Sequence, residues 1–302
     1  MVVESTAVRP ALPPPIASIV AQIPAWAQAH SITLTPLSEV ISLNNTPYQI
    51  TVDGQHYYMR LAADTVHWLG VSRAEEGIAA RAAAEVGVCP PIVYYDDAGN
   101  MVTHFIHGRH WEPHEFHEPA NRARLVDLLQ RLHGAKGVQA TGSVFRRIER
   151  LIASASALHV PLPEDMDRHL AALRSIEVMR DRDTRFRPGL SHNDLWANNM
   201  LDDGQRLWLV DWEFGGDGDG LYDLATVALS SRATEAQRAD LLAQYGYTAD
   251  EDGAQLHAMT HVVWCFEAMW ALVQYGLRGA GDYDYQAHAQ RIMQKMNAYL
   301  DG

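Results

Sequence analysis

The chain has 302 residues, 47% of them hydrophobic and 20% charged, which suits one large globular domain or two lobes. Its 37 acidic and 24 basic residues give a formal net charge of −13, which argues against a nucleic-acid-binding protein. The two cysteines, Cys89 and Cys265, are typical of a reducing compartment. The N-terminus has no signal-peptide core, and the longest apolar run, residues 258–273, is interrupted by His261 and Glu267. We therefore expect a cytoplasmic protein with no membrane span and no nucleic-acid partner.

The first third of the chain has the pattern of antiparallel strands with one inserted helix. Residues 1–15 are rich in proline, and we expect them to form a flexible tail. Residues 47–62 alternate in polarity around the hairpin turn Asp53-Gly54, and residues 91–106 form a second hairpin pattern. Between the two hairpins, the Ala- and Glu-rich residues 73–87 predict a helix.

Helical periodicity dominates from about residue 120 onward. We expect helices over residues 121–135, 144–158, 166–181, 222–231, 235–246, 255–279 and 285–300. The sequence thus predicts an α+β, bilobal protein. A β-rich lobe of residues 16–106 precedes a larger, mainly helical lobe of residues 107–302.

Polar side chains interrupt the helical pattern between residues 191 and 216. The loop "HNDLWANN" carries Asp194 and Asn199, and the apolar run "RLWLV" ends at Asp211. Such groups are costly to bury unless something satisfies them. Phosphoryl transfer needs one carboxylate beside the attacking hydroxyl and oxygen ligands for magnesium ions on the nucleotide phosphates. Asp194 suits the first role, and Asn199 and Asp211 suit the second.

These segments resemble the aminoglycoside phosphotransferase and choline kinase family, which has the protein-kinase-like bilobal fold. The family's His-x-Asp-x-x-x-x-Asn loop is matched by residues 192–199, and its Asp-x-Glu segment by "VDWEFGG". Its Gly-Asp-Pro-x-x-Asp segment is matched by "GDGLYD", with Gly220 in place of proline. The resemblance extends from about residue 36 to the end. It implies a kinase that uses ATP and Mg²⁺ and phosphorylates the hydroxyl of a small molecule.

The resemblance also implies roles for residues around the loop. Asp194 would be the catalytic base, and Glu213 would orient a metal-bound water or contact the substrate. His192 would brace the loop rather than carry a proton. Asp223 resembles the family's structural aspartate, and the alternative is a simple cap at a helix N-terminus.

In the small lobe, Arg60 stands where kinases carry the phosphate-binding lysine, and an arginine contacts phosphate through two donors. Glu76 is its expected partner, with Glu75 as the alternative, and a solvated surface ion pair is the competing interpretation. The segment "FIHGRHW" resembles the family's hinge, which implies that His104 and Ile106 contact the nucleotide.

The turn that covers the phosphates in this family contributes two further nucleotide-binding candidates, Ser42 and Asn45. Ser42 replaces a glycine of the family pattern, and Glu39 precedes it. A side chain hinders the approach of backbone amides to phosphate, so this turn predicts a weaker nucleotide site.

The acceptor pocket is expected on the helix near the C-terminus. Trp264, Glu267 and Trp270 recur there at steps of three, with Tyr275 beyond them, and Trp196 is a candidate for the pocket wall. Aromatic rings beside a carboxylate bind quaternary ammonium groups, and the resemblance implies aromatic acceptor residues in this region. Core packing is the competing interpretation.

Five histidines lie at the expected join of the lobes: His104, His107, His110, His114 and His117. Their spacing differs from that of the helical zinc motif His-Glu-x-x-His, so we expect a polar loop rather than a metal site.

The predicted function is the transfer of the γ-phosphoryl group of ATP to choline or a related amino alcohol, by a monomer or homodimer. The alternative acceptors are an aminoglycoside, a sugar or a thiamine-like alcohol. A non-catalytic, pseudokinase-like binding module is the alternative of another class, because the turn before Asn45 is poor in glycine.

Overall fold

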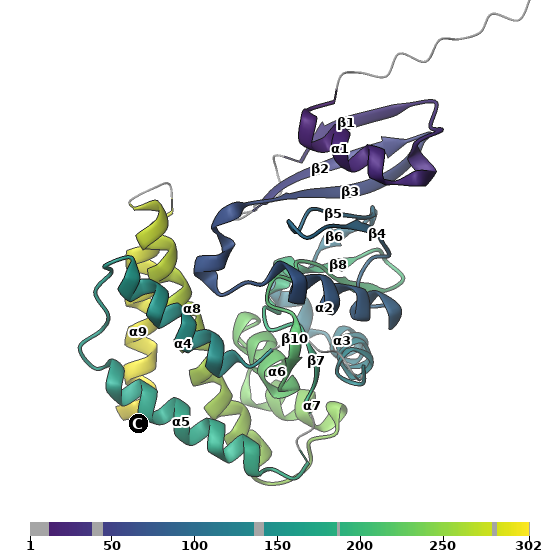
Figure 1. Ribbon diagram of the computed structural model, residues 1–302. Coiled ribbons are helices and arrows are strands. Elements are labelled where there is room, and N and C mark those ends of the chain that lie inside the picture. Colours follow the sequence, from purple (N-terminus) through teal and green to yellow (C-terminus); the bar gives the residue numbers. More distant parts are fainter. Residues whose placement is uncertain (1–11, 38–44, 136–141, 186–187, 280–282, 302) are drawn as a thin grey trace, which may run out of the picture.

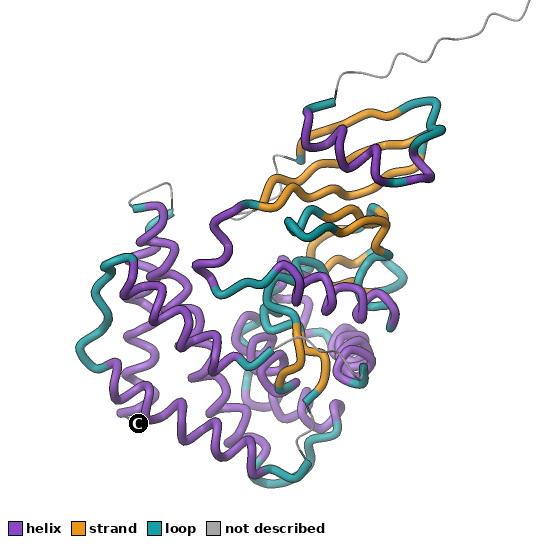
Figure 2. Tube along the Cα trace, viewed as in Figure 1, coloured by secondary structure: helices purple, strands orange, loops and turns teal. Residues whose placement is uncertain are grey.

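The computed structural model describes residues 12–37, 45–135, 142–185, 188–279 and 283–301. Its strands gather in the N-terminal part, and helices make up most of the remainder (Figure 2). The predicted α+β, bilobal architecture is therefore confirmed.

The small lobe is built on one antiparallel sheet with the strand order β1-β2-β3-β5-β4 (Figure 1). Its strands are β1 (Ile32–Pro36), β2 (Asn45–Val52), β3 (Gln55–Ala62), β4 (Ile92–Tyr95) and β5 (Met101–His104). Both predicted hairpins are present, as the pairs β2–β3 and β4–β5. Asp53 and Gly54 join β2 to β3 with φ of 49° and 83°, as a two-residue turn with two positive φ angles requires.

The outer face of this sheet is covered by helix α1 (Pro14–Gln22) and the short η1 (Pro24–Trp26). Ile16 and Ile19 of α1 form one apolar core with side chains of the sheet such as Met59. Helix α1 therefore begins inside the predicted tail, because Pro14 and Pro15 form its first turn, where a missing N–H costs nothing. Since side chains alternate along a strand, Arg60 lies on the face opposite to Met59, toward the large lobe.

Helix α2 (Arg73–Glu85) connects the sheet to the large lobe, after the short η2 (Asp64–Leu69). The predicted helix starts at Ser72, whose side chain accepts the Glu75 N–H at 3.4 Å. Ala79, Ala80 and Ala83 are completely buried in the core that extends through the large lobe. These small side chains let α2 pack closely against the large lobe.

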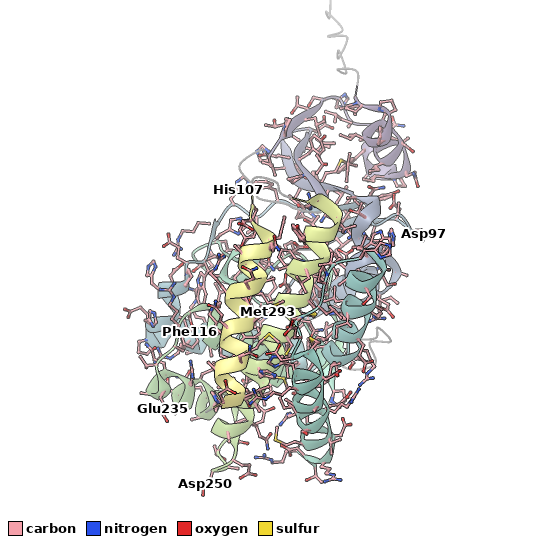
Figure 3. The ribbon with its side chains drawn as sticks, turned by 90° about the vertical axis from the view of Figure 1, so that its left-hand side faces the viewer. Asp97, His107, Phe116, Glu235, Asp250 and Met293 are labelled. Atoms are coloured by element: carbon pink, nitrogen blue, oxygen red, sulfur yellow. The ribbon has the colours of Figure 1, made fainter. Side chains whose placement is uncertain are left out.

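All seven helices predicted for the large lobe are present. They are α3 (Pro119–His133), α4 (Val144–Ala157), α5 (Met166–Arg182), α6 (Gly220–Ser230), α7 (Glu235–Tyr245), α8 (Asp252–Arg278) and α9 (Tyr285–Asp301). Among the described residues, α8 alone is long and apolar enough to cross a membrane, and 72% of its most apolar window is buried inside the protein. It is the central helix of the lobe, packed against α4, α6 and α9. Figure 3 shows α8 beside α9, where Met293 is labelled.

Short strands hold the loop between α5 and α6. β7 (Gly189–Ser191) pairs with β10 (Gly216–Gly218), and β8 (Met200–Asp202) pairs with β9 (Leu207–Leu209) and with β6 (Arg109–His110). Two further short helices are η3 (Pro113–His117) and η4 (Ala197–Asn199). The small-lobe sheet ends at His104, and β6 already pairs with the large lobe. The chain therefore changes lobe near His107, which Figure 3 labels.

Candidate active site

The loop from β7 to β8 brings Asp194 and Asn199 together. The Asn199 side-chain amide donates to the backbone carbonyl of Asp194 at 2.8 Å and to its Oδ2 at 2.9 Å. The Asn199 Oδ1 accepts a hydrogen bond from Asn198 at 3.2 Å. The side-chain NH₂ group of Asn199 thus donates to Asp194, while its Oδ1 has a second lone pair that can bind another group, such as a metal ion.

The backbone of Val210 fixes the following segment to this loop. Its N–H donates to the Asn199 carbonyl at 3.0 Å, and its own carbonyl lies 3.0 Å from His192 Nε2. Asp211 comes next, with a φ of 65°, a left-handed conformation that aspartate tolerates better than most residues. Buried His192 therefore braces the segment that carries Asp211, and burial lowers the pKa of the His192 ring.

The electrostatics of this pair of carboxylates favour a cation. Burial raises the pKa of Asp194 to about 7, against the hydrogen bond from Asn199 and with the help of the charges of Glu213 and Glu267. The pKa of Asp211 is raised too, by desolvation and then by Glu213, although the residue still reaches solvent. Desolvation disfavours both ionised carboxylates, and a bound cation would favour them.

Asp223 binds the backbone of the loop through its carboxylate. Its two carboxylate oxygens accept the N–H groups of His192 and Asn193, each at 2.8 Å, and His133 Nε2 lies 3.0 Å from one of them. The alternative role as a helix cap is wrong, because Asp219 is the N-cap of α6 and accepts the Leu221 N–H. Asp223 instead lies in the first turn, completely buried.

The small lobe contributes a buried ion pair. Arg60 Nη1 lies 2.5 Å from Glu76 Oε1, and the two residues are 2% and 1% exposed. The competing interpretations, a solvated surface pair and Glu75 as the partner, are therefore wrong. Burial alone would raise the pKa of Glu76, but Arg60 and Arg73 keep it below its ordinary value.

Arg73 is a residue of this site that the sequence pattern did not indicate. Its Nη1 lies 2.6 Å from Glu76 and 3.1 Å from Glu213, and its Nη2 donates to Asn45 at 3.0 Å. Asn45 also donates to Glu213 at 2.7 Å. Glu213 thus faces the small lobe rather than an acceptor pocket. The spacing of three between Arg73 and Glu76 was the available signal, but it is common on helix surfaces.

The other residues predicted to contact the nucleotide are more exposed or lie outside the described residues. His104 is exposed and Ile106 half-buried at the join of the lobes. Ser42 and Glu39 lie outside the described residues.

The histidines at the join have separate partners. His110 lies 2.6 Å from the Asn198 carbonyl, His114 pairs with Glu112, and His117 with Gln237. Within the described parts of the chain, no group of three or more His, Cys, Asp or Glu side chains is arranged to hold a metal.

The aromatic stripe of α8 faces α9. The Trp264 ring lies 6.4 Å from Tyr299, and the Trp270 ring 5.8 Å from Tyr285. Between them, Glu267 Oε1 lies 2.9 Å from His288 Nε2. Trp196 and Tyr275 are half-buried at the edge of the large-lobe core. The charge of Glu267 is also one of the smaller contributions that raise the pKa of Asp194, after burial.

His288 and Tyr283 complete the surroundings of Glu267, and the sequence pattern indicated neither. The Tyr283 hydroxyl lies 2.8 Å from His288 Nδ1, and its ring packs 4.9 Å from Tyr285. Tyr283 is 46% exposed, unusually open for a large aromatic side chain. Tyr283 thus presents one accessible ring close to the Glu267–His288 pair, and an aromatic face beside a carboxylate is a suitable contact for an organic cation.

These observations define a class of protein: a kinase-like phosphotransferase, with its candidate reaction centre beneath a small β-sheet lobe. Comparison with known families agrees. The chain belongs to the phosphotransferase enzyme family, whose model matches residues 37–257. The predicted family and the class of small-molecule kinase are thereby confirmed.

Among the individual relatives are LicA proteins and choline or ethanolamine kinases. Protein LicA of Haemophilus influenzae is 25% identical over 222 residues, which span 72% of this chain and only 63% of that protein. The structure of a choline/ethanolamine kinase family protein from Mesorhizobium loti has a TM-score of 0.75 at 24% identity and covers 95% of this chain and 94% of its own. Choline kinase LicA from Streptococcus pneumoniae has a TM-score of 0.72 at 20% identity, with 94% and 99% covered. These two structures establish the protein-kinase-like fold.

Proposed function

We propose that the protein transfers the γ-phosphoryl group of ATP to the hydroxyl of choline or a closely related amino alcohol, with Mg²⁺ held by Asn199 and Asp211. The observation that carries the choice of acceptor is Glu267, a carboxylate on the same stretch of α8 as Trp264 and Trp270, whose rings contact Tyr299 and Tyr285 of α9.

The donor set suits magnesium. Mg²⁺ prefers oxygen ligands and is usually bound by one or two protein groups together with nucleotide phosphates and water. The Asn199 oxygen and the Asp211 carboxylate are such groups. Burial and then the charge of Glu213 raise the pKa of Asp211, and a bound cation would favour its ionised form. When bound, Mg²⁺ would neutralise the phosphate charge that develops during transfer.

Asp194 is placed to orient the acceptor hydroxyl and to take its proton. With a pKa of about 7, it can exist in either protonation state near neutral pH, as a general base requires. The hydrogen bond from Asn199 fixes the direction of one oxygen, Oδ2. The oxygen of the hydroxyl forms the new bond to phosphorus, and the bond to the ADP oxygen breaks.

Arg60 is the phosphate-binding residue in this proposal. Glu76 orients it at 2.5 Å, and its Nη2 donates to the Gly99 carbonyl at 2.8 Å. These two contacts limit the orientations of the guanidinium group, and an arginine held in this way is suited to bind phosphate oxygens.

The aromatic surroundings of Glu267 favour a quaternary ammonium acceptor. Such a cation cannot donate hydrogen bonds, so it is bound by ring faces and by Coulomb attraction. Trp270, Tyr285 and Tyr283 form a row of ring contacts, and the Tyr283 hydroxyl contacts His288, the partner of Glu267. The similarity to a LicA protein and to a choline kinase supports the same acceptor class.

A phosphate-transfer screen tests the proposal. Purified protein and Mg²⁺-ATP are incubated with choline, ethanolamine, thiamine, an aminoglycoside and a simple sugar, and ADP and the phosphorylated product are both measured. We expect choline or ethanolamine to be phosphorylated and the sugar to be inert. Product with only the sugar or the aminoglycoside would overturn the acceptor class. No Mg²⁺-ATP-dependent thermal stabilisation would favour the pseudokinase-like alternative.

A further inference from the structure

One guanidinium group connects the two lobes of the candidate site. Arg73, the first residue of α2, contacts Asn45 on β2, Glu76 one turn along α2 and Glu213 after β9. Glu213 is 140 residues away along the chain and belongs to the segment that carries Asp211. The Arg73 and Glu213 side chains are only 9% and 4% exposed. We propose that Arg73 is a positioning residue, which holds the phosphate-binding pair Arg60–Glu76 at a fixed place relative to the metal-binding segment.

The two carboxylate oxygens of Glu76 contact different arginines. Its Oε1 lies 2.5 Å from Arg60, and its Oε2 lies 2.6 Å from Arg73 and 3.1 Å from the hydroxyl of Tyr95. Because both oxygens are engaged, the carboxylate has one orientation. The direction in which Arg60 points therefore depends on Arg73, although the two arginines need not touch.

The second observation is the contact between Arg73 and Glu213. Glu213 lies two residues after Asp211, and its side chain is only 4% exposed. Arg73 provides an opposite charge at 3.1 Å and contacts one oxygen of Glu213. Without Arg73, this buried carboxylate would lose a cationic partner that helps to fix its orientation, although the hydrogen bond from Asn45 at 2.7 Å would remain.

The turn between β4 and β5 lies beside both arginines, and Gly99 is its residue of contact. Gly99 has a φ of 86°, and its carbonyl oxygen accepts a hydrogen bond from Arg60 Nη2 at 2.8 Å. A Cβ atom at Gly99 would overlap the Arg73 side chain at Cδ. The turn thus leaves room for Arg73 while it orients Arg60, and glycine meets both requirements.

The inference rests on the proposed use of Mg²⁺-ATP, and three variants test it. Arg73→Met removes the charge and the donors, and Arg73→Lys keeps the charge but cannot reach three partners in one plane. Arg81→Met is the matched control, because Arg81 lies on the same helix and is exposed. Each protein is examined by thermal shift with Mg²⁺-ATP and by steady-state kinetics.

We expect Arg73→Met and Arg73→Lys to raise KM for ATP about 10- to 100-fold, as loss of charge-assisted hydrogen bonds does, while KM for the acceptor changes less than about twofold. The thermal shift by Mg²⁺-ATP should fall in parallel, and Arg81→Met should match the wild type. Unchanged KM for ATP and an unchanged thermal shift in Arg73→Lys would overturn the inference, even if Arg73→Met fails to fold. Equal increases in both KM values would assign Arg73 a merely structural role. A wild type that Mg²⁺-ATP does not stabilise would instead contradict the proposed function.

Discussion

The nucleotide side and the acceptor side of the candidate site are held together by different kinds of contact. On the proposed nucleotide side, two buried carboxylates, Glu76 and Glu213, form short ion pairs with Arg60 and Arg73. On the proposed acceptor side, α8 carries Glu267 between Trp264 and Trp270, and His288 of α9 lies 2.9 Å from the carboxylate. Buried charge pairs fix geometry, whereas aromatic rings bind cations without directional hydrogen bonds. We therefore expect a rigid donor site and an acceptor site that adapts more readily to its ligand.

The largest effect is expected at the group between the two sides. Asp194→Asn should lower kcat by roughly 10²- to 10⁴-fold, the usual contribution of a general base. Mg²⁺-ATP should still stabilise the variant, because Asn199 and Asp211 remain. Steady-state kinetics and a thermal shift measure the two quantities. Turnover close to that of the wild type would remove Asp194 from the proposed role.

Asp211→Asn probes the nucleotide side itself. We expect Mg²⁺ to add no stabilisation beyond that of ATP with EDTA, a loss of about 2.7 kcal/mol where the ligand stands at 100 times its Kd. Asp203→Asn is the control, because Asp203 lies in the β8–β9 turn and binds Trp208 instead. Retained magnesium dependence in Asp211→Asn would mean that the metal ligand is another residue.

Asp223 supports both sides, and its loss should reduce stability rather than change substrate preference. Asp223→Ala leaves the N–H groups of His192 and Asn193 without their acceptor, at about 1–3 kcal/mol each. Thermal unfolding measures this cost. A variant as stable as the wild type would show that the loop is braced elsewhere.

The same carboxylate predicts a pH dependence. Burial acts to raise the pKa of Asp223, but His133 and the backbone donors hold it below its ordinary value of 3.8. Its contribution to stability is therefore complete above about pH 4 and is lost as the pH falls through the lower, folded-state pKa. The free energy of unfolding should decline less steeply below pH 4 in Asp223→Asn than in the wild type. Identical slopes would contradict this account.

The contrast between the two sides also explains what the sequence could predict. Asp194, Asn199 and Asp211 lie within one short stretch, and local backbone contacts such as those of Val210 bring them together. The hairpins and helices were likewise predicted from local signals, namely turn residues and hydrophobic periodicity. Arg73 could not be recognised, because its partner Glu213 is 140 residues away and only the folded chain brings them together.

Helix α1 was missed for a related reason. Its two opening prolines resemble those of a disordered tail, and only the apolar face buried on the sheet distinguishes it. On the acceptor side, the spacing of Trp264, Glu267 and Trp270 predicted one face of a helix. It could not show that α9 and the residues just before it would supply His288 and Tyr283 to the same place.

Glu267→Gln should change the acceptor side alone. Without the carboxylate charge, KM for choline should rise about tenfold, in line with the 1–2 kcal/mol of a desolvated cation contact, and KM for ATP should stay the same. His288→Gln is the matched control, because it changes the neighbour of Glu267 and leaves the charge in place. A choline KM that does not respond to Glu267→Gln would exclude this carboxylate from the pocket.

Trp264→Phe should have the smallest effect and decides where the acceptor pocket ends. Trp264 packs against Tyr299, near the C-terminal end of α9, and its indole N–H is buried without a hydrogen-bond partner among the described residues. Replacing it with phenylalanine removes that unsatisfied donor and leaves a small void, so we expect a stability change below about 1.5 kcal/mol. KM for choline should be unaltered. An increase in KM comparable to that of Glu267→Gln would instead extend the pocket along the whole stripe, from Trp264 to Trp270.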